Sequence, residues 1–337
     1  MTYEIDVSVV ICTYNRAEML RGALASLLGL ETDASWRYEV IVVDNASTDA
    51  TVEVVADVAR EAKVPFRGVY EPKPGVACAR NRGVAEARGR YVAFFDDDQV
   101  ADPNWLRELL EMVRKEKARC VGGAVHLLLP TTAPPLPEIC RRLLGEAIGA
   151  DKPVKYSRKM FPGTGNMLVE RTVFDEVGTF NESLRQAGED SDLFLRMLQA
   201  GITGWYAPLA IVRHVIPEYR VRETYFRWVF RRNGWTTAER DRTHRGVFML
   251  IAILGARLMQ AMGVNLWRML FARLRGDRAA ELGWRCLLWR AEGYMRCALR
   301  YLAPRLCAQK VYREYLEFRG ERQLLGGNAA AESLSRA

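Results

Sequence analysis

The 337-residue sequence lacks several short motifs that identify common protein classes. It has three His and no Cys-x-x-Cys pair, which argues against a His-based or Cys-based zinc site. Its seven Cys are scattered and odd in number, so we expect a reducing compartment rather than a disulfide framework. No Walker-type phosphate loop is present, and Gly163-Thr-Gly165 lacks the third Gly of a dinucleotide fingerprint. Two common nucleotide-binding classes are therefore excluded.

We also expect no N-terminal leader, and long uncharged runs are few. The acidic residues Glu4 and Asp6 precede the first apolar run, and no basic stretch lies there, so the sequence predicts no secretory signal. The longest uncharged run of the last third covers residues 246–256, well short of the roughly 20 residues that cross a bilayer. We expect a cytoplasmic protein whose helices do not span the membrane.

Acidic residues are scarce in one part of the chain. Residues 1–212 contain 25 Lys and Arg against 30 Asp and Glu, whereas residues 213–337 contain 24 against 11, for net charges of −5 and +13. Arg residues flank Trp267, Trp284 and Trp289 in the basic part. Two interpretations stay open: these helices lie on an anionic membrane surface as a peripheral attachment, or they form a helical subdomain packed on the core.

Strand and helix patterns alternate along the first part of the chain. Four short apolar runs, at residues 7–12, 38–43, 66–70 and 90–95, are separated by segments with helical spacing. Continuous apolar strands that alternate with helices predict an α/β fold with a mainly parallel sheet, whose ligands bind at the carboxyl ends of the strands. Residues 130–137 are Pro-rich and predict a surface loop. Beyond about residue 220 the pattern predicts only Arg-rich helices.

Three carboxylates, Asp96, Asp97 and Asp98, come directly after the fourth apolar run. Adjacent negative charges repel one another unless a cation lies between them, and oxygen ligands favour Mg²⁺ or Mn²⁺ shared with substrate phosphates. The plain alternative is a solvated acidic loop.

A second acidic group, Glu189 and Asp190 after Gly188, precedes a helical pattern. Alone, this group is explained by capping of the helix N-terminus. Together with the first group it suggests group transfer to a hydroxyl, which needs both a cation for a phosphate leaving group and a carboxylate base for the acceptor.

Five motifs in order give the sequence a specific resemblance. They are Val9-Val-Ile-Cys-Thr13-Tyr-Asn15-Arg16, Val42-Val43-Asp44-Asn-Ala-Ser47-Thr-Asp49, Gly75-Val-Ala-Cys-Ala-Arg80-Asn81-Arg-Gly83, Asp96-Asp-Asp98 with Pro103, and Gly188-Glu189-Asp190 with Arg196 and Gly201. Over residues 5–215 the chain resembles glycosyltransferase family 2, inverting enzymes with the GT-A fold. We expect a catalytic domain at residues 1–215 and an Arg-rich helical region at residues 216–337.

The resemblance implies a role for each matching position. The expected nucleotide-sugar contacts are Thr13, Tyr14, Asn15, Asp44, Ser47, Arg80, Asp96 and Asp97. Asp98 is the main expected metal ligand, with Asp96 and His214, and Asp190 is the expected general base, helped by Glu189. The expected acceptor-side residues are Gly163, Thr164, Gly165 and Asn166, with Phe180-Asn181-Glu182 nearby. The implied cofactor is Mn²⁺ or Mg²⁺.

One motif of processive family members is absent. Gln-x-x-Arg-Trp is not found, because Thr224 stands where Arg227-Trp228 would need the Gln. We therefore expect transfer of one sugar from a nucleoside-diphosphate donor, expected to be UDP-linked, to a saccharide or lipid-linked saccharide in cell-surface polysaccharide synthesis. The alternatives are a sugar nucleotidyltransferase, whose Gly-rich loop after the first strand is missing here, and a nucleic-acid-binding protein, in which the acidic motifs would have no purpose.

Overall fold

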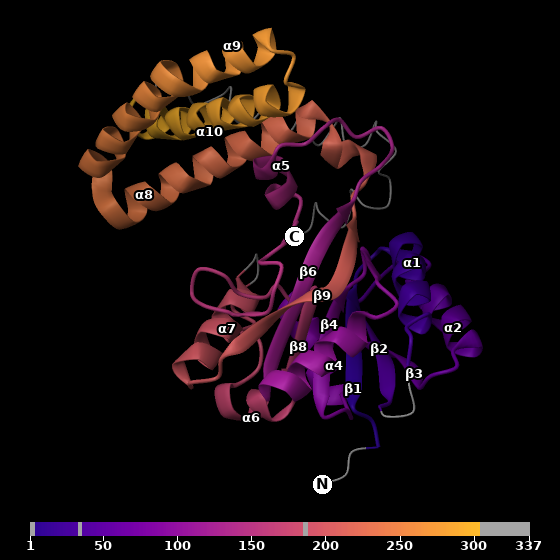
Figure 1. The fold of residues 1–337 in the computed structure, drawn as a ribbon. Helices are drawn as coiled ribbons and strands as arrows, with labels where there is room; N and C mark the ends of the chain where they lie inside the picture. The colour runs from indigo at the N-terminus through magenta and orange to yellow at the C-terminus, as the bar shows by residue number, and fades with distance from the viewer. Residues whose placement is uncertain (1–3, 33–35, 185–187, 304–337) are drawn as a thin grey trace. The chain divides into compact units, whose positions relative to one another are not determined.

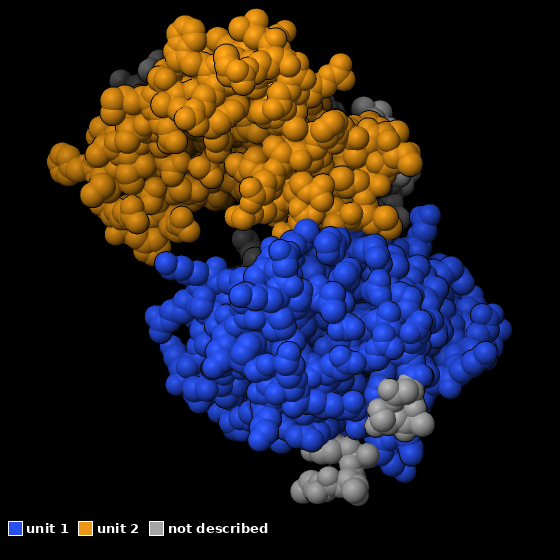
Figure 2. Space-filling model, in the orientation of Figure 1, with its two compact units in different colours: residues 1–126, 147–215, 332–337 blue, residues 127–146, 216–331 orange. Residues whose placement is uncertain are grey.

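A computed structural model describes residues 4–32, 36–184 and 188–303. The chain divides into two compact units, which Figure 2 colours separately. Among the described residues, unit 1 contains the chain up to His126 together with Ala147–Val215, and unit 2 contains Leu127–Glu146 and the chain from Ile216 onward. The expected boundary after residue 215 stays a prediction, and the structure adds that residues 127–146 belong with the later helices.

Unit 1 is built on a mixed nine-stranded sheet with the order β3-β2-β1-β4-β8-β6-β9-β5, in which β7 also pairs with β9 (Figure 1). Its strands are β1 (Val7–Thr13), β2 (Tyr38–Asp44), β3 (Phe66–Tyr70), β4 (Tyr91–Asp96), β5 (Gln99–Ala101), β6 (Cys120–Leu128), β7 (Val154–Lys155), β8 (Asn166–Glu170) and β9 (Gly204–Val215). The first four strands in that spatial order are parallel, and β1, β2 and β4 are the buried, nearly continuous apolar strands that predict such a sheet. Strand β8 runs antiparallel to β4, and the remaining paired strands extend the sheet in antiparallel fashion.

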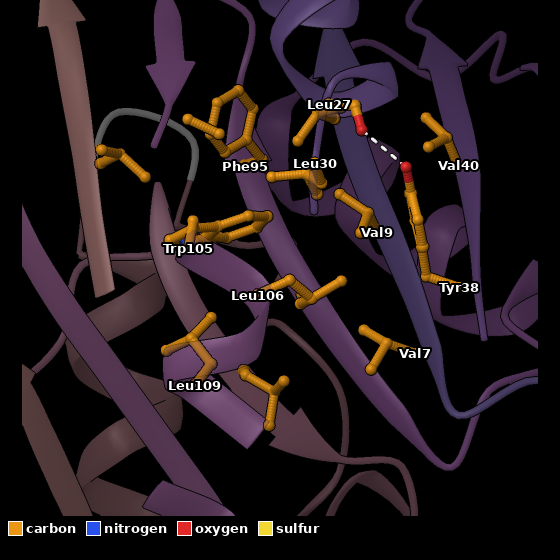
Figure 3. Packing of buried hydrophobic residues seen from close by; sticks show 14 of the residues in the cluster. Val7, Val9, Leu27, Leu30, Tyr38, Val40, Phe95, Trp105, Leu106 and Leu109 are labelled. Atoms are coloured by element: carbon orange, nitrogen blue, oxygen red, sulfur yellow. Dashed lines mark hydrogen bonds between the residues drawn. The ribbon is translucent and has the colours of Figure 1, made fainter. Parts of the chain in front are cut away.

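Along the sequence, the helices of unit 1 lie between these strands. They are α1 (Ala17–Leu28), α2 (Thr51–Glu61), α3 (Val76–Glu86), α4 (Trp105–Glu116), α6 (Thr172–Val177) and α7 (Glu189–Gln199). Helix α4 carries its apolar residues on one stripe, and Trp105, Leu106 and Leu109 of that stripe are fully buried in the core that contains β1 and β2 (Figure 3). Each such side chain stabilises the fold by about 1.5–3 kcal/mol.

Unit 2 is helical among its described residues. It contains α5 (Glu138–Leu143), the 3₁₀ turn η1 (Glu218–Val221), α8 (Glu223–Gln260), the π-helical turn η2 (Ala261–Asn265), α9 (Leu266–Leu274) and α10 (Arg278–Leu302). Helices α8 and α10 pack closely at two glycines: a Cβ on Gly234 would lie 2.0 Å from the Arg290 carbonyl oxygen, and one on Gly293 would lie 2.0 Å from that of Arg231. Any side chain at either position would push the helices apart.

The helical path through Glu223–Leu274 is long and apolar enough to cross a membrane by length and composition, with a mean hydropathy of 1.9 over its best 18-residue window. The eleven-residue uncharged run therefore underestimates the length of the apolar segment, because a single charged residue, Arg257, interrupts a longer apolar stretch. The path is not regular, since Gly246 has φ 79° and ψ 175° inside α8.

Candidate active site

The carboxyl ends of the parallel strands bring the first predicted residues together. Thr13 at the end of β1 pairs with Asp44 at the end of β2, and Cys12 pairs with Asp96 at the end of β4. All three strand ends therefore face one edge of the sheet, as the fold predicts for a ligand site. Burial raises the pKa of Cys12 to about 12, against the opposing effect of Arg80, so this thiol stays protonated and unreactive.

The loops after β1 and β2 are hydrogen-bonded to each other. The Asn15 backbone N–H donates to Ser47 Oγ at 2.9 Å, and the Thr48 N–H donates to Asn15 Oδ1 at 2.7 Å. Asp44 Oδ1 accepts the Ser47 N–H at 2.9 Å. Asn15 holds a left-handed backbone with φ 51°, which Asn tolerates better than most residues. These hydrogen bonds of Asn15, Asp44 and Ser47 thus connect the two loops. Tyr14, in the loop after β1, is half-buried.

Asn45 fastens a third loop to this edge, a role that the sequence analysis did not assign. Its Nδ2 donates to the carbonyl oxygens of Glu71 at 3.0 Å and Lys73 at 2.7 Å, and its Oδ1 accepts the Gly75 N–H at 2.8 Å. Gly75 has φ 134°, a conformation open to glycine. No local sequence signal predicts this role, because the three contacts join positions that are 26, 28 and 30 residues apart.

Arg16 lies between Asp97 and Asp98, where the sequence analysis expected a divalent metal ion. Its Nη1 lies 2.7 Å from Asp97 Oδ1 and 3.0 Å from Asp98 Oδ2. Burial raises the pKa of Asp97 to about 6, although Arg16 opposes the rise. The sequence analysis missed this pairing, since Arg16 and Asp97 are 81 positions apart and only the tertiary fold shows the contact.

The residues expected to hold a metal are only partly assembled. His214 Nε2 lies 3.3 Å from Asp98 Oδ2, because β9 and β5 pair His214 with Gln99. Asp96 instead lies beside Arg80, with Oδ1 3.7 Å from Nη2. Within residues 4–303, apart from the two undescribed gaps, no three His, Cys, Asp or Glu residues gather in a metal-binding group. The carboxylate oxygens of Asp98 suit a Mn²⁺ or Mg²⁺ that takes its other ligands from a diphosphate and water.

Arg80 joins the two acidic groups. It is buried on α3, its Nη1 forms an ion pair with Glu189 Oε1, and its Nη2 reaches Asp96. Burial raises the pKa of Asp96, and Arg80 offsets part of that rise. The structure therefore places Arg80 between the strand end and α7, whereas a contact with the nucleotide stays a prediction.

Glu189 and Asp190 lie in the first turn of α7, preceded by Gly188 in a left-handed conformation. Neither caps the helix in the manner expected from the sequence, because Gly188 occupies the cap position and no side chain caps the helix there. Asp190 Oδ1 accepts the N–H of its neighbour Ser191 at 2.6 Å. Glu189 Oε2 is buried and has no hydrogen-bond partner among the described residues, which is uncommon for a buried polar atom.

The acceptor-side segment runs against the acidic edge. A Cβ on Gly165 would lie 2.4 Å from Asp96 Oδ2, so only glycine allows this approach. Thr164 is buried and Gly163 is exposed. Asn166 is buried, and its side chain donates to the carbonyl oxygens of Ala124 and Ala210 while accepting the indole N–H of Trp105 at 2.8 Å. The side chain of Asn166 therefore joins strands and α4 rather than facing a substrate.

The Phe180-Asn181-Glu182 segment is tied to α3. Asn81 Nδ2 donates to the Phe180 carbonyl oxygen and to Glu182 Oε1, each at 3.0 Å, and Lys73 forms an ion pair with Glu182. The predicted acceptor segment, the loop after β3 and the helix of Arg80 are thus fastened together.

A parallel half-sheet with a nucleotide-type loop pair, an acidic strand end and a second carboxylate group defines a transferase of the GT-A fold class. A solved structure of GalNAc-T7 with UDP, GalNAc and Mn²⁺ is similar in fold, with a TM-score of 0.51 and 19% identity over 67% of this chain and 47% of that one. The family model described as glycosyl transferase family 2 matches residues 8–178. The chain belongs to this family and is a glycosyltransferase.

Curated relatives support the same assignment. The succinoglycan biosynthesis protein ExoM of Rhizobium meliloti (strain 1021) is 32% identical over 65% of this chain and 69% of its own length. The glycosyltransferase AglE of Haloferax volcanii is 28% identical over 54% of this chain and 58% of its own length. The chain thus spans less than two thirds of AglE and less than half of the GalNAc-T7 chain.

Proposed function

We propose that the protein is an inverting, metal-dependent glycosyltransferase that moves one sugar from a UDP-linked donor to a hydroxyl of a saccharide or lipid-linked saccharide. The observation that carries the proposal is the guanidinium of Arg80, which contacts Asp96 at the strand end and Glu189 beside Asp190. A single buried cation thus links the carboxylates of the leaving-group side to those of the acceptor side. Group transfer to a hydroxyl requires these two functions within reach of one substrate.

The donor would bind along the strand ends. Thr13, Tyr14, Asn15, Asp44 and Ser47 would contact the base and ribose, since their two loops form one connected wall at that edge. Asp98 and His214 would hold the Mn²⁺ or Mg²⁺, with Asp96 and Asp97 completing the charge of the site. A divalent ion held by these residues would supply positive charge for the diphosphate leaving group.

The acceptor would bind on the side of α7. Asp190 accepts the proton of the attacking hydroxyl, and Glu189, held by Arg80, keeps the first turn of α7 in place. The hydroxyl attacks the anomeric carbon from the face opposite the diphosphate, so the configuration inverts without a covalent intermediate. Gly163, Thr164 and Gly165 form the wall next to Asp96.

We further propose a place in cell-surface polysaccharide synthesis, at the cytoplasmic face of the membrane. The name of the relative ExoM, a succinoglycan biosynthesis protein, and the net charge of +13 over residues 213–337 support this. A lipid-linked acceptor is found at such a surface, and basic residues favour anionic lipids. We propose no nucleic-acid partner.

The test is nucleotide release from a panel of nucleoside-diphosphate sugars, with Mn²⁺, with Mg²⁺ and with a chelator. We expect UDP release from a UDP-sugar in the presence of either ion and a loss of release in the chelator. Release of pyrophosphate from a nucleoside triphosphate and a sugar phosphate would instead identify a nucleotidyltransferase and overturn the proposal. If no UDP-sugar is turned over and a donor with another nucleotide is, the UDP assignment is wrong and the rest of the proposal stands.

A further inference from the structure

One stretch of unit 2 exposes an unusual amount of apolar surface. Of the 22 exposed large apolar side chains among the described residues, 11 lie between Val247 and Leu274. Phe248 is 92% exposed, Met259 72%, Trp267 65% and Leu274 86%. We call these 11 side chains the α8–α9 apolar face: Val247, Phe248, Met249, Ile251, Leu258, Met259, Met262, Val264, Trp267, Phe271 and Leu274. An apolar face of this extent marks a site of interaction with a protein or a membrane.

One side of α8 is packed in a hydrophobic core with α10, so the exposed apolar side chains lie on a helix that is otherwise folded against its neighbour. Leu250 is fully buried with Tyr294, Cys297 and Ala298 of α10, and Ile253 and Leu254 pack against that cluster. Arg257 is turned to this side, with its guanidinium 4.5 Å from the centre of the Tyr294 ring. Helix α10 therefore covers one side of α8, and the residues of the apolar face are those of this stretch that stay between 36% and 92% exposed.

The charge beside the apolar face is of one sign. Residues 246–276 contain four Arg, at positions 257, 268, 273 and 275, and no Asp or Glu. Arg268 and Arg275 lie over the rings of Trp284 and Phe271, at 5.1 and 4.1 Å from the ring centres. Apolar side chains flanked by Arg and aromatic rings match the boundary between acyl chains and anionic head groups. A second copy of the same face would instead bring like charges together.

The helix arrangement favours lying in the interface over crossing it. Helix α10 is packed along α8 through the two close glycine contacts, and its sequence from Arg278 to Leu302 contains five Arg and two Glu. If α8 crossed the bilayer, either this charged helix or the bare inner side of α8, with Arg257, would enter hydrocarbon, which is costly. The break at Gly246 also interrupts the helix at the start of the apolar stretch.

We propose that the α8–α9 apolar face docks the protein on an anionic phospholipid bilayer, with α8 and α9 lying in the interface. This proposal names the surface that would bring the enzyme to a lipid-linked acceptor. Only the link to that acceptor rests on the proposed function; membrane docking itself does not. The side chains of the face insert among the acyl chains, while Arg268, Arg273 and Arg275 contact lipid phosphates.

The test is co-sedimentation of the full-length protein with vesicles of phosphatidylcholine alone and of phosphatidylcholine with one quarter phosphatidylglycerol. We expect binding to the mixed vesicles and little binding to the neutral ones. Phe248→Ser, Met259→Ser and Trp267→Ser combined should weaken binding by on the order of 10²-fold, because three large apolar side chains no longer leave water. Arg268→Gln, Arg273→Gln and Arg275→Gln combined should weaken it by a similar, salt-sensitive factor.

The control variant is Val52→Ser with Leu209→Ser, which removes two exposed apolar side chains of unit 1. It should sediment as the parent protein does. Nucleotide release from a soluble donor should be the same in all four proteins, so a failed docking surface and a failed catalytic assignment give different results.

Two outcomes would overturn the proposal. Equal binding of the parent protein and the Phe248, Met259 and Trp267 variant would show that other residues contact the bilayer. If the parent protein is a dimer by light scattering, the same variant is a monomer, and neither sediments with vesicles, the face joins two copies of the chain.

Discussion

The acidic edge of unit 1 and the α8–α9 apolar face of unit 2 differ in what their charged side chains contact. At the edge, two Arg are paired with buried or partly buried carboxylates: Arg16 lies between Asp97 and Asp98, and Arg80 is paired with Glu189. At the face, Arg268 and Arg275 lie over aromatic rings. Charges that do chemistry inside a fold must be paired because burial without a partner is costly, whereas charges that meet a lipid surface find their partners outside the protein.

The largest effect that separates the two regions should come from Asp98→Ala. We expect loss of transfer and loss of metal-dependent donor binding, because Asp98 is the main carboxylate near His214. The fold should persist, since Arg16 keeps Asp97 as its partner. Vesicle binding should not change. Calorimetric titration of the donor with and without Mn²⁺ is the measurement, with the exposed Asp57→Ala as control; metal-dependent donor binding that survives in Asp98→Ala would remove the metal-site assignment.

Asp190→Asn should lower turnover by about 10²–10⁴-fold, the usual contribution of a general base. Donor affinity should be retained, because the substitution keeps the size of the side chain and lies on α7 rather than at the strand ends. Asp192→Asn is a matched control in the same helical turn, where Asp192 pairs with Arg196 instead. Steady-state kinetics compare the two variants, and equal turnover in both would assign Asp190 a structural role.

The pairing of Arg80 with Glu189 can be tested by stability. Arg80→Met leaves Glu189 buried without its cation and should destabilise unit 1 by about 3–5 kcal/mol. Adding Glu189→Met should recover most of that loss, since the buried Glu189 charge is then removed together with its partner. Arg60→Met breaks an exposed pair with Asp57 and should change stability by less than about 1 kcal/mol. Urea unfolding measures all three; an Arg80→Met variant as stable as Arg60→Met would show that the pair does not hold the site together.

The smallest effect concerns a buried charge of unit 1 that has no part in the site. Burial would raise the pKa of Glu39, but hydrogen bonds from Ser8, Arg67 and the Arg88 N–H together lower it below its ordinary value of 4.5. A carboxyl with a lowered pKa stabilises the fold above pH 4.5 and loses that contribution as the pH falls below it. Glu39→Gln should therefore flatten the fall in urea midpoint between neutral and acidic pH. An unchanged slope would mean that Glu39 does not titrate with unfolding.

Local sequence patterns predicted the parallel strands and the residues at their ends. The apolar runs leading to Thr13, Asp44 and Asp96 could form only buried strands, and parallel order places their carboxyl ends at one edge. Contacts between distant positions were not predictable. Arg16 gives no local sign of pairing with Asp97, and Asn166 reaches Ala124, Ala210 and Trp105 only after three elements have packed.

The exposure of the α8–α9 apolar face was also beyond sequence analysis. The spacing of apolar residues after Gly246 is equally compatible with a helix buried in a subdomain, and only the packing of α10 decides which side of α8 is covered. The role of residues 127–146 was missed for a similar reason. A Pro-rich stretch signals a loop, but it does not say which core the following helix α5 joins.

The way residues 127–146 join unit 2 governs the order in which the protein can fold during translation. Cys140 and Leu144 share a core with Phe226, Phe230 and Cys286, and the sulfur atoms of Cys140 and Cys286 are 3.5 Å apart. When α5 leaves the ribosome its partners have not yet been made, so its apolar side must wait about 140 residues for α10, which at about 5–20 residues per second is roughly 7–30 seconds. The core of unit 2 thus closes late although it contains the early helix α5, and no single cut in the chain separates unit 2 from unit 1 without removing α5 from its partners.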